Sequence, residues 1–161
     1  RVARRIGAGA AALITDAGTP GVEDPGARLV RLARAGGARI VPIPGPSAVT
    51  AALSVAGLPR CPVLYLSLLP RESAARRRVL RDSARYALVI MDAPYRLRAV
   101  VDDALDALGP GRAAVLCADI STASEKVVAG SLSEIARAAR EIAKAEFVLV
   151  VHPPAEDRPP A

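Results

Sequence analysis

Short apolar runs alternate with turn-rich segments and helical patterns along the first third of the chain. The runs at 10–14 and 39–43 each lead into a turn, and helical patterns follow at 27–35 and 48–55. A short apolar run bounded by turn signals predicts a buried strand. Because the connections are helices and not tight hairpins, we predict a parallel sheet here. Ser47 directly precedes the second helix and is its predicted N-cap.

The Gly- and Pro-rich segment 57–62 lacks any period, so we place a lobe boundary at residue 58. Beyond it the pattern alternates again between strands and helices. Ser131 and Glu134 have the spacing of a capping box. The pattern predicts an α/β protein with lobes at 1–58 and 59–152 and a disordered tail at 153–161. The predicted elements of the second lobe are strands at 63–69, 87–91, 113–118, 125–129 and 147–151, and helices at 73–85, 97–108 and 132–144.

Composition narrows the class of protein only in part. The chain has 161 residues, 52% of them hydrophobic, and a net charge of +6 that is carried mostly by Arg. This charge fits either an anionic partner or a generally Arg-rich composition. No apolar run approaches the roughly 20 residues of a membrane span, and no signal peptide is visible, so we expect a cytoplasmic protein without a membrane partner. Cys61 and Cys117 lack paired spacing, so we expect buried free thiols and no metal site.

The segment 15–26 (TDAGTPGVEDPG) is the strongest candidate for a ligand site. It joins a predicted strand to a predicted helix, at the sheet edge where α/β folds bind ligands. Its glycines permit close backbone approach, and Asp16 and Asp24 add negative charge. This favours a zwitterionic or cationic ligand over a nucleoside triphosphate, because the loop lacks the Lys of a phosphate-binding loop. The alternative is that both carboxylates only cap turns and the following helix.

This loop and the later segment 41–47 (VPIPGPS) together resemble the tetrapyrrole (corrin/porphyrin) methylase superfamily, most of all its ribosomal RNA small subunit methyltransferase I branch. Segments 57–59, 68–70 and 94–96 extend the resemblance over about residues 1–152. It implies two αβα lobes, the first with a mainly parallel sheet and the second with a mixed one. It also implies S-adenosyl-L-methionine as the cofactor, direct methyl transfer to a ribose 2'-oxygen of ribosomal RNA or the small ribosomal subunit, and a homodimer.

The resemblance also implies which residues contact the cofactor. The loop residues would lie at its methionine part, Ser47 and Ala48 nearby, and three strand-end residues around its adenosine. Ser47 as a helix cap, and Met91 and Ala118 as core, are the alternatives. The full set of implied contacts is Asp16, Ala17, Gly18, Thr19, Pro20, Asp24, Ser47, Ala48, Met91, Asp92 and Ala118; no residue is assigned a catalytic role.

Departures from the branch leave the methyl acceptor open. The chain begins with Arg1 and lacks the family's N-terminal portion, so we expect a fragment. Segment 91–94 replaces a Tyr-Glu pair of the ribosomal enzymes, and segment 118–122 replaces their Arg-Glu-Leu-Thr-Lys. The alternatives are therefore a corrin- or porphyrin-type small-molecule methyltransferase, or a non-catalytic remnant that keeps the fold and the dimer surface.

A basic stretch on the helix at 73–85 has two interpretations. It would either follow a nucleic-acid backbone or form a solvated helix face. Tyr86 is its only aromatic neighbour for base stacking. His152, the one histidine, adjoins the Pro-rich tail and is not expected to act as a general base. The basic stretch consists of Arg71, Arg76, Arg77, Arg78, Arg81 and Arg85.

Overall fold

The computed structural model describes residues 9–15 and 18–155, which fall into two compact units. The first unit is Arg1–Ser47 and the second is Ala48–Ala161. The sequence pattern placed this boundary at residue 58. In the structure helix α3 (Ala48–Val55) already packs on the strands of the second unit, and the second unit therefore begins at α3.

The first unit contains one of its predicted helices but not its predicted strands. Helix α2 (Ala27–Ala35) ends at Gly36 and Gly37, as the sequence predicts. Within the described residues, segments 10–14 and 39–43 are not assigned to strands, and Ile14 and Ile43 are 84% and 73% exposed. A strand needs a neighbour to pair its N–H and C=O groups. In the described part of this unit neither segment is paired as a strand, so the parallel sheet predicted for the first lobe stays a prediction.

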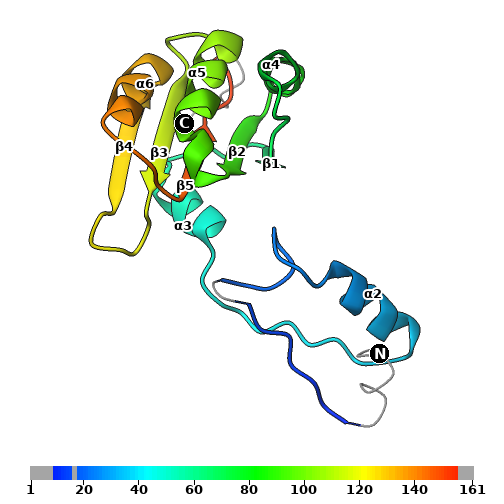
Figure 1. Ribbon diagram of the computed structural model, residues 1–161. Helices are drawn as coiled ribbons and strands as arrows, with labels where there is room; N and C mark the ends of the chain where they lie inside the picture. Colours follow the sequence, from blue (N-terminus) through cyan, green and yellow to red (C-terminus); the bar gives the residue numbers. More distant parts are fainter. Residues whose placement is uncertain (1–8, 16–17, 156–161) are drawn as a thin grey trace. The chain divides into compact units, whose positions relative to one another are not determined.

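The second unit is built on a five-stranded mixed sheet with the order β1-β2-β5-β3-β4 (Figure 1). Strand β1 pairs parallel with β2, whereas β5 lies antiparallel between β2 and β3. Strands β1, β2 and β3 therefore run in one direction and end at one edge of the sheet. The strands are β1 (Val63–Ser67), β2 (Ala87–Asp92), β3 (Ala113–Ala118), β4 (Lys126–Ser131) and β5 (Phe147–Val151).

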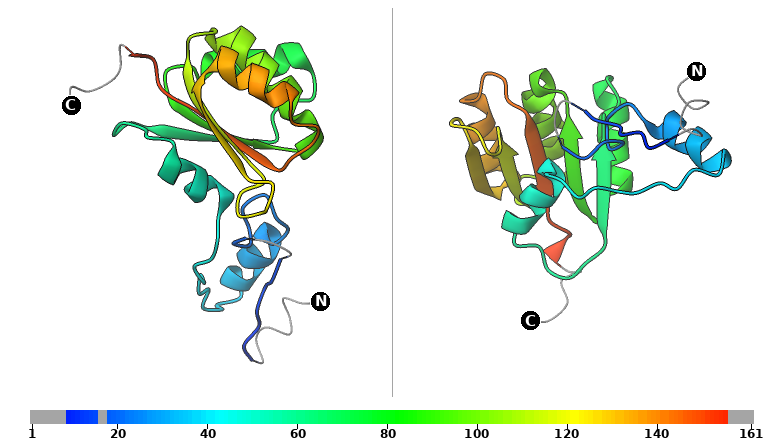
Figure 2. Two further views of the ribbon diagram at one scale, coloured as in Figure 1. Left: turned by 90° about the vertical axis from the view of Figure 1, so that its left-hand side faces the viewer. Right: turned by 90° about the horizontal axis from the view of Figure 1, so that it is seen from below.

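Helices cover both faces of this sheet, which explains the continuous apolar runs of its central strands. Figure 2 shows α3 on one face and helices α5 (Leu97–Leu108) and α6 (Leu132–Arg140) on the other. Helix α4 (Ser73–Asp82) packs beside α5. Side chains of β5 alternate between the faces, since Val148 and Val150 join the α3 side and Leu149 the opposite side. The predicted mixed sheet of the second lobe is thus confirmed as the middle layer of an αβα unit.

The capping box predicted from Ser131 and Glu134 is present at the start of α6. The backbone N–H of Glu134 donates to Ser131 Oγ (3.4 Å), and the N–H of Ser131 donates to Glu134 Oε2 (2.7 Å). The N–H of Ser131, and after it the Ser131 hydroxyl, which donates to the same carboxylate oxygen (2.7 Å), lower the pKa of Glu134. The helix ends at Arg140, short of the predicted residue 144, and Arg98 on α5 donates hydrogen bonds to the carbonyls of Arg140 and Ile142 beyond this end.

The remaining features concern the membrane and the C-terminus. Across the described ranges, none of the helices combines the length and apolarity that crossing a membrane requires. Pro153, at the start of the predicted disordered tail, is buried, and residues 156–161 lie outside the described part of the chain.

Candidate functional site

Two loops of the first unit approach each other closely. Gly18 has φ +72°, a left-handed conformation that favours glycine, and a Cβ at this position would lie 3.4 Å from the carbonyl oxygen of Pro46. A Cβ at Gly45 would lie 3.4 Å from Thr19 Oγ1. The structure therefore brings together the two segments on which the family resemblance rests. Backbone groups at this contact have no Cβ to keep a ligand away.

The other candidate residues of the first part of the chain lie close to these two loops in the sequence. Pro20 and Asp24 are half-buried in the same loop. Ser47 is half-buried immediately before α3, and Ala48 is the exposed first residue of that helix. Asp16 and Ala17, the first two residues of the predicted set, lie outside the described residues.

The candidates of the second unit lie where the parallel strands end. Met91 on β2 is half-buried, packs with the α3-side cluster, and lies beside Ser67 of β1 and Val148 of β5. Ala118 ends β3 and belongs to the cluster on the opposite side. Because side chains alternate along a strand, those of Met91 and Ala118 occupy opposite faces of the sheet. One ligand would reach both only at the strand ends, through backbone groups.

The carboxylate of Asp92 is buried and holds two loops together. It accepts hydrogen bonds from the backbone N–H of Leu69 (3.1 Å) and Ala93 (2.7 Å) and from Arg96 Nη1 (2.9 Å). Arg96 Nη2 donates in turn to the carbonyl of Pro70 (2.6 Å). These bonds tie the loop after β1 to the loop after β2. The Asp92 side chain is thus engaged within the protein, and its backbone is what remains for a ligand.

Ser67 is a polar residue of this edge that the sequence pattern did not single out. Its Oγ is fully buried and has no hydrogen-bond partner among the described residues. Ser67 lies directly beside Met91 in the register of β1 and β2. An unsatisfied buried hydroxyl costs about 1–3 kcal/mol, so a ligand atom that bonds to it would recover this free energy. The available signal was a serine at the last position of an otherwise apolar strand.

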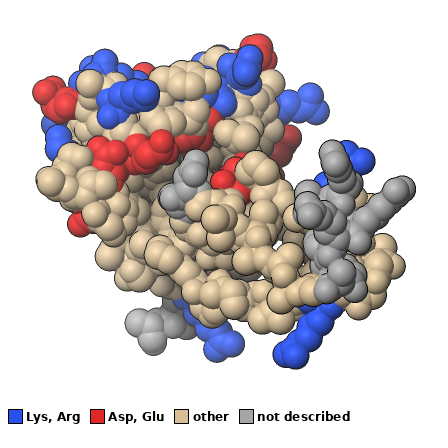
Figure 3. All heavy atoms as spheres, turned by 60° about the horizontal axis from the view of Figure 1, so that its bottom comes forward, with Lys and Arg blue, Asp and Glu red and all other residues tan. Residues whose placement is uncertain are grey.

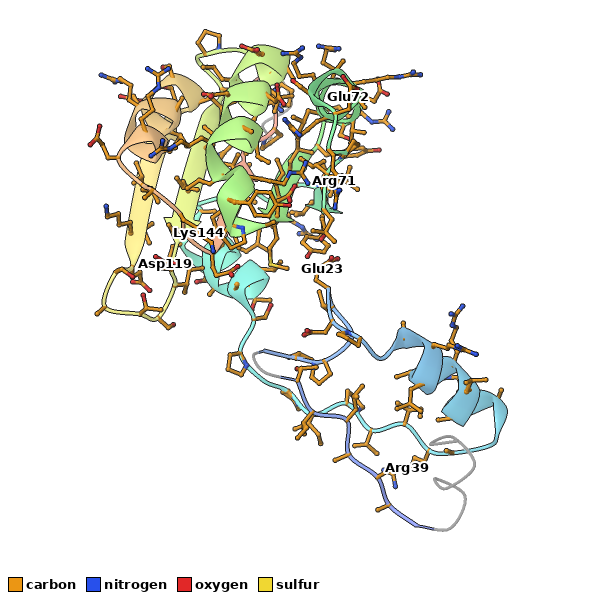
Figure 4. All side chains as sticks on the ribbon, in the orientation of Figure 1. Glu23, Arg39, Arg71, Glu72, Asp119 and Lys144 are labelled. Carbon is orange, nitrogen blue, oxygen red and sulfur yellow. The ribbon has the colours of Figure 1, made fainter. Side chains whose placement is uncertain are left out.

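The turn after β3 is held by Asp119, which lies at the same end of the unit as Lys144 (Figure 4). Asp119 Oδ1 accepts from the N–H of Glu146 (3.0 Å), and Oδ2 accepts from Ser124 Oγ (3.2 Å). These bonds tie the β3–β4 turn to the start of β5. Asp119 therefore acts within this turn as a structural acceptor.

The described residues offer few candidates for a nucleophile or for a set of metal ligands. Burial raises the pKa of the Cys117 thiol, and Glu125 raises it further, so this cysteine stays protonated near neutral pH. Cys61 is half-buried and both cysteines are free. His152 Nε2 lies 2.9 Å from the carbonyl oxygen of Ala56, which holds the ring against α3. Searching the ranges 9–15 and 18–155 finds no group of three or more His, Cys, Asp or Glu side chains that would hold a metal ion.

The Arg residues of the basic stretch are divided between the interior and the surface: Arg76 is buried and Arg77 half-buried, whereas Arg71, Arg78, Arg81 and Arg85 are exposed. Arg76 is 4% exposed and forms an ion pair with Asp103 on α5, to which Ser73 Oγ also donates (2.7 Å). Arg77 reaches Asp106 on the same helix (3.2 Å). Arg85 lies over the ring of Tyr86, 4.7 Å from its centre. On the face shown in Figure 3, Asp and Glu side chains lie close to Lys and Arg side chains of the molecule.

The described structure is that of an α/β protein, with glycine-containing loops that meet in the first unit and parallel strands that end at one sheet edge in the second. The sequence pattern of the Tetrapyrrole (Corrin/Porphyrin) Methylases matches residues 1–136, which is most of the chain. The chain belongs to this family, which confirms the resemblance inferred from its loops.

Curated relatives support the same assignment. The Ribosomal RNA small subunit methyltransferase I of Mycobacterium tuberculosis (strain CDC 1551 / Oshkosh) is 42% identical over 126 residues, covering 77% of this chain and 44% of the relative. The protein of the same name from Xylella fastidiosa (strain Temecula1 / ATCC 700964) is 38% identical over 156 residues, covering 93% of this chain and 57% of the relative. The chain spans about half the length of the relatives it matches.

Solved structures show the same fold. The methyltransferase CobJ matches with a TM-score of 0.63 at 22% identity, covering 86% of this chain and 62% of its own. Uroporphyrin-III C-methyl transferase from Thermus thermophilus, complexed with S-adenyl homocysteine, matches with a TM-score of 0.56 at 22% identity, covering 84% of this chain and 62% of its own.

Proposed function

We propose that this chain is part of an S-adenosylmethionine-dependent methyltransferase that methylates a ribose 2'-oxygen of ribosomal RNA. The observation that carries the proposal is the identity of about 40% to relatives named Ribosomal RNA small subunit methyltransferase I. The S-adenyl homocysteine in the Thermus relative supports the choice of cofactor. Cytoplasmic location and homodimerisation belong to the same proposal and follow from the family resemblance.

The described residues fit such a cofactor. Gly18 and Gly45 leave backbone uncovered where the two loops meet, which suits a ligand bound through main-chain groups. Thr19, Pro20, Asp24, Ser47 and Ala48 are proposed to complete these contacts, together with Asp16 and Ala17. Met91, the backbone of Asp92, and Ala118 are proposed to contact the adenosine, and the unsatisfied hydroxyl of Ser67 would bond to a polar atom beside Met91.

In direct methyl transfer, the main role of the protein is to position the methyl donor and the acceptor. When bound, S-adenosylmethionine supplies a methyl group on a positively charged sulfur. Holding donor and acceptor in line converts an encounter into an intramolecular step, which is worth up to about 7–11 kcal/mol of the barrier. The bonds of Asp92 and Arg96 fix the ends of two loops at the sheet edge and would supply this rigidity. No metal or covalent intermediate is required.

Calorimetric titration of the full-length protein with S-adenosylmethionine and its demethylated product tests the cofactor. Gly18→Ala should weaken binding at least tenfold, because a Cβ there both strains the backbone and crowds Pro46. Gly37→Ala is the matched control: Gly37 also has positive φ, but a Cβ there meets nothing within 4 Å. Absence of heat at millimolar ligand would contradict the proposal and favour the non-catalytic remnant.

Ser67→Ala probes the second unit. If Ser67 bonds to the cofactor, the variant should bind it about 5- to 15-fold more weakly, because one neutral hydrogen bond contributes roughly 1–1.5 kcal/mol. Its melting temperature without ligand should be unchanged or raised, since the unsatisfied hydroxyl is removed. Unchanged affinity would remove Ser67 from the site. Ser54→Ala, on the exposed side of α3, is the control.

The acceptor is tested by transfer of a radiolabelled methyl group. Full-length protein should label small-subunit ribosomal RNA, and the label should appear on a ribose oxygen after nuclease digestion. Labelling of a uroporphyrinogen-type substrate in place of RNA would instead support the corrin- or porphyrin-type alternative.

A further inference from the structure

A hollow of about 460 Å³ opens between the loops that follow β1 and β2. It is lined by Arg71, Arg76, Tyr95, Arg96 and Ala99. Arg71 lies on the loop between β1 and α4, where Figure 4 labels it beside Glu72. Tyr95 belongs to the short helix η1 (Pro94–Arg96) that directly follows β2. The hollow therefore lies at the same sheet edge as Met91, where the cofactor is proposed to bind.

The walls of the hollow are rigid and carry an excess of positive charge. Arg76 Nη1 and Arg96 Nη2 both donate to the carbonyl of Pro70, at 2.9 and 2.6 Å. Their charges are balanced by Asp103 and Asp92. The carboxylate of neighbouring Glu72 is occupied by the backbone N–H groups of Ala74 and Ala75 in α4. Arg71 is exposed, and it is the cation of this hollow for which the structure records no such side-chain bond.

Tyr95 supplies an aromatic ring to the same hollow. Its side chain is 72% exposed, whereas Tyr65 and Tyr86 are half-buried and Phe147 is buried. These four are all the aromatic residues of the chain, so its one exposed ring lies in this hollow. The ring sits on a fixed turn, because the N–H of Arg96 donates to the carbonyl of Ala93 (2.8 Å). An exposed ring and a guanidinium that line one hollow are the pair of groups by which proteins stack a base and bind a phosphate of a single strand.

We propose that this hollow binds single-stranded RNA, with a backbone phosphate on Arg71 and an unpaired base stacked on Tyr95. The proposal rests on the RNA methyltransferase function proposed above and names where its substrate would be held. It replaces the basic helix as the nucleic-acid contact of the second unit, since Arg76, Arg77 and Arg78 of that helix are paired with Asp103, Asp106 and Asp82.

Fluorescence anisotropy with a labelled, unstructured RNA of about twelve nucleotides tests the hollow in the full chain without cofactor. Tyr95→Ala should weaken binding about 5- to 150-fold, as expected for loss of one stacked base, while Tyr95→Phe should bind like the parent protein. Arg71→Ala should weaken binding and lower the slope of log affinity against log salt by about one, as expected for loss of one phosphate contact.

Arg81→Ala is the matched control, because it removes an exposed positive charge of α4 away from the hollow. Equal losses in Arg71→Ala and Arg81→Ala, or full affinity in Tyr95→Ala, would overturn the proposal. So would displacement of the RNA by millimolar inorganic phosphate, which would indicate a phosphate site without stacking, or equal competition by duplex DNA. The cofactor titration distinguishes this proposal from the proposed function. If the protein binds the cofactor but its RNA affinity does not depend on Tyr95, only the RNA-binding role of the hollow is refuted. If RNA affinity depends on Tyr95 but no cofactor binds, the methyltransferase function is refuted.

Discussion

Two pairs of apolar segments in this chain look alike in sequence and differ in the structure. In the second unit, β2 and β5 are buried on both faces by helices and paired along their lengths. In the first unit, segments 10–14 and 39–43 have similar apolar content but expose Ile14 and Ile43 and are not assigned to strands. The difference shows that an apolar run becomes a strand only when neighbours pair its backbone and cover its faces.

Amide hydrogen exchange should show this contrast at its largest. Amides of β2, β3 and β5 should open only with global unfolding, at about 5 kcal/mol or more. Amides of segments 10–14 and 39–43 should exchange at nearly unprotected rates, because no strand pairing covers them. Strong protection of the first-unit segments would remove the contrast.

Asp103→Ala tests how much the buried ion pair of Arg76 and Asp103 stabilises the second unit. Removing this carboxylate leaves the 4% exposed Arg76 as an uncompensated buried charge, which costs about 3–5 kcal/mol. Urea unfolding followed by circular dichroism measures the loss. Asp102→Ala, on the exposed side of the same helix, should change stability by less than about 0.5 kcal/mol. Similar losses in both variants would refute the role assigned to the ion pair.

A pair of core truncations compares the two regions directly. Leu149→Ala should lower the free energy of unfolding by about 2–5 kcal/mol, because Leu149 is 0% exposed in the centre of the sheet. Ile43→Ala removes a side chain that is 73% exposed and should cost less than about 0.5 kcal/mol. A large effect at Ile43 would mean that this side chain is covered in solution.

The smallest effect is expected at the capping box. The folded state lowers the pKa of Glu134 below its ordinary value of 4.5, so its contribution to stability is present above about pH 4.5 and is lost as the pH falls through the folded value. The stability difference between the parent protein and Glu134→Ala should therefore shrink in acid. Ser131→Ala and Glu134→Ala should be non-additive, since both remove the hydrogen bond that the Ser131 hydroxyl donates to Glu134 Oε2 (2.7 Å); additive effects would contradict the coupling.

Local signals were enough to predict the second unit. Helix α5 and strands β3 and β5 begin and end where the pattern places them, because each has a clear period and a turn signal at both ends. At the end of α6, which is shorter than predicted, the distant side chain of Arg98 binds the carbonyl of Arg140. Such a contact joins residues more than forty positions apart in the sequence, so no local pattern reports it.

The candidate site was predictable in part. Motif spacing located the two first-unit loops, and the structure shows them in contact. Motif spacing did not reveal that the carboxylate of Asp92 accepts hydrogen bonds from Leu69, Ala93 and Arg96. These bonds depend on how two loops fold back on the sheet edge. Nor did motif spacing reveal Ser67 or the hollow at Tyr95, because exposure and missing hydrogen bonds are properties of the packed chain.

The position of β5 has a consequence for the order in which the second unit assembles. This strand is the last of the sheet in sequence yet lies between β2 and β3, which have no ladder with each other. During synthesis, the β1–β2 half and the β3–β4 half can each form early, but they cannot join until residues 147–151 have left the ribosome. Strand β5 is thus the element that joins the two halves of the sheet. A chain interrupted before it would hold two small sheets with open edges, a state prone to aggregation.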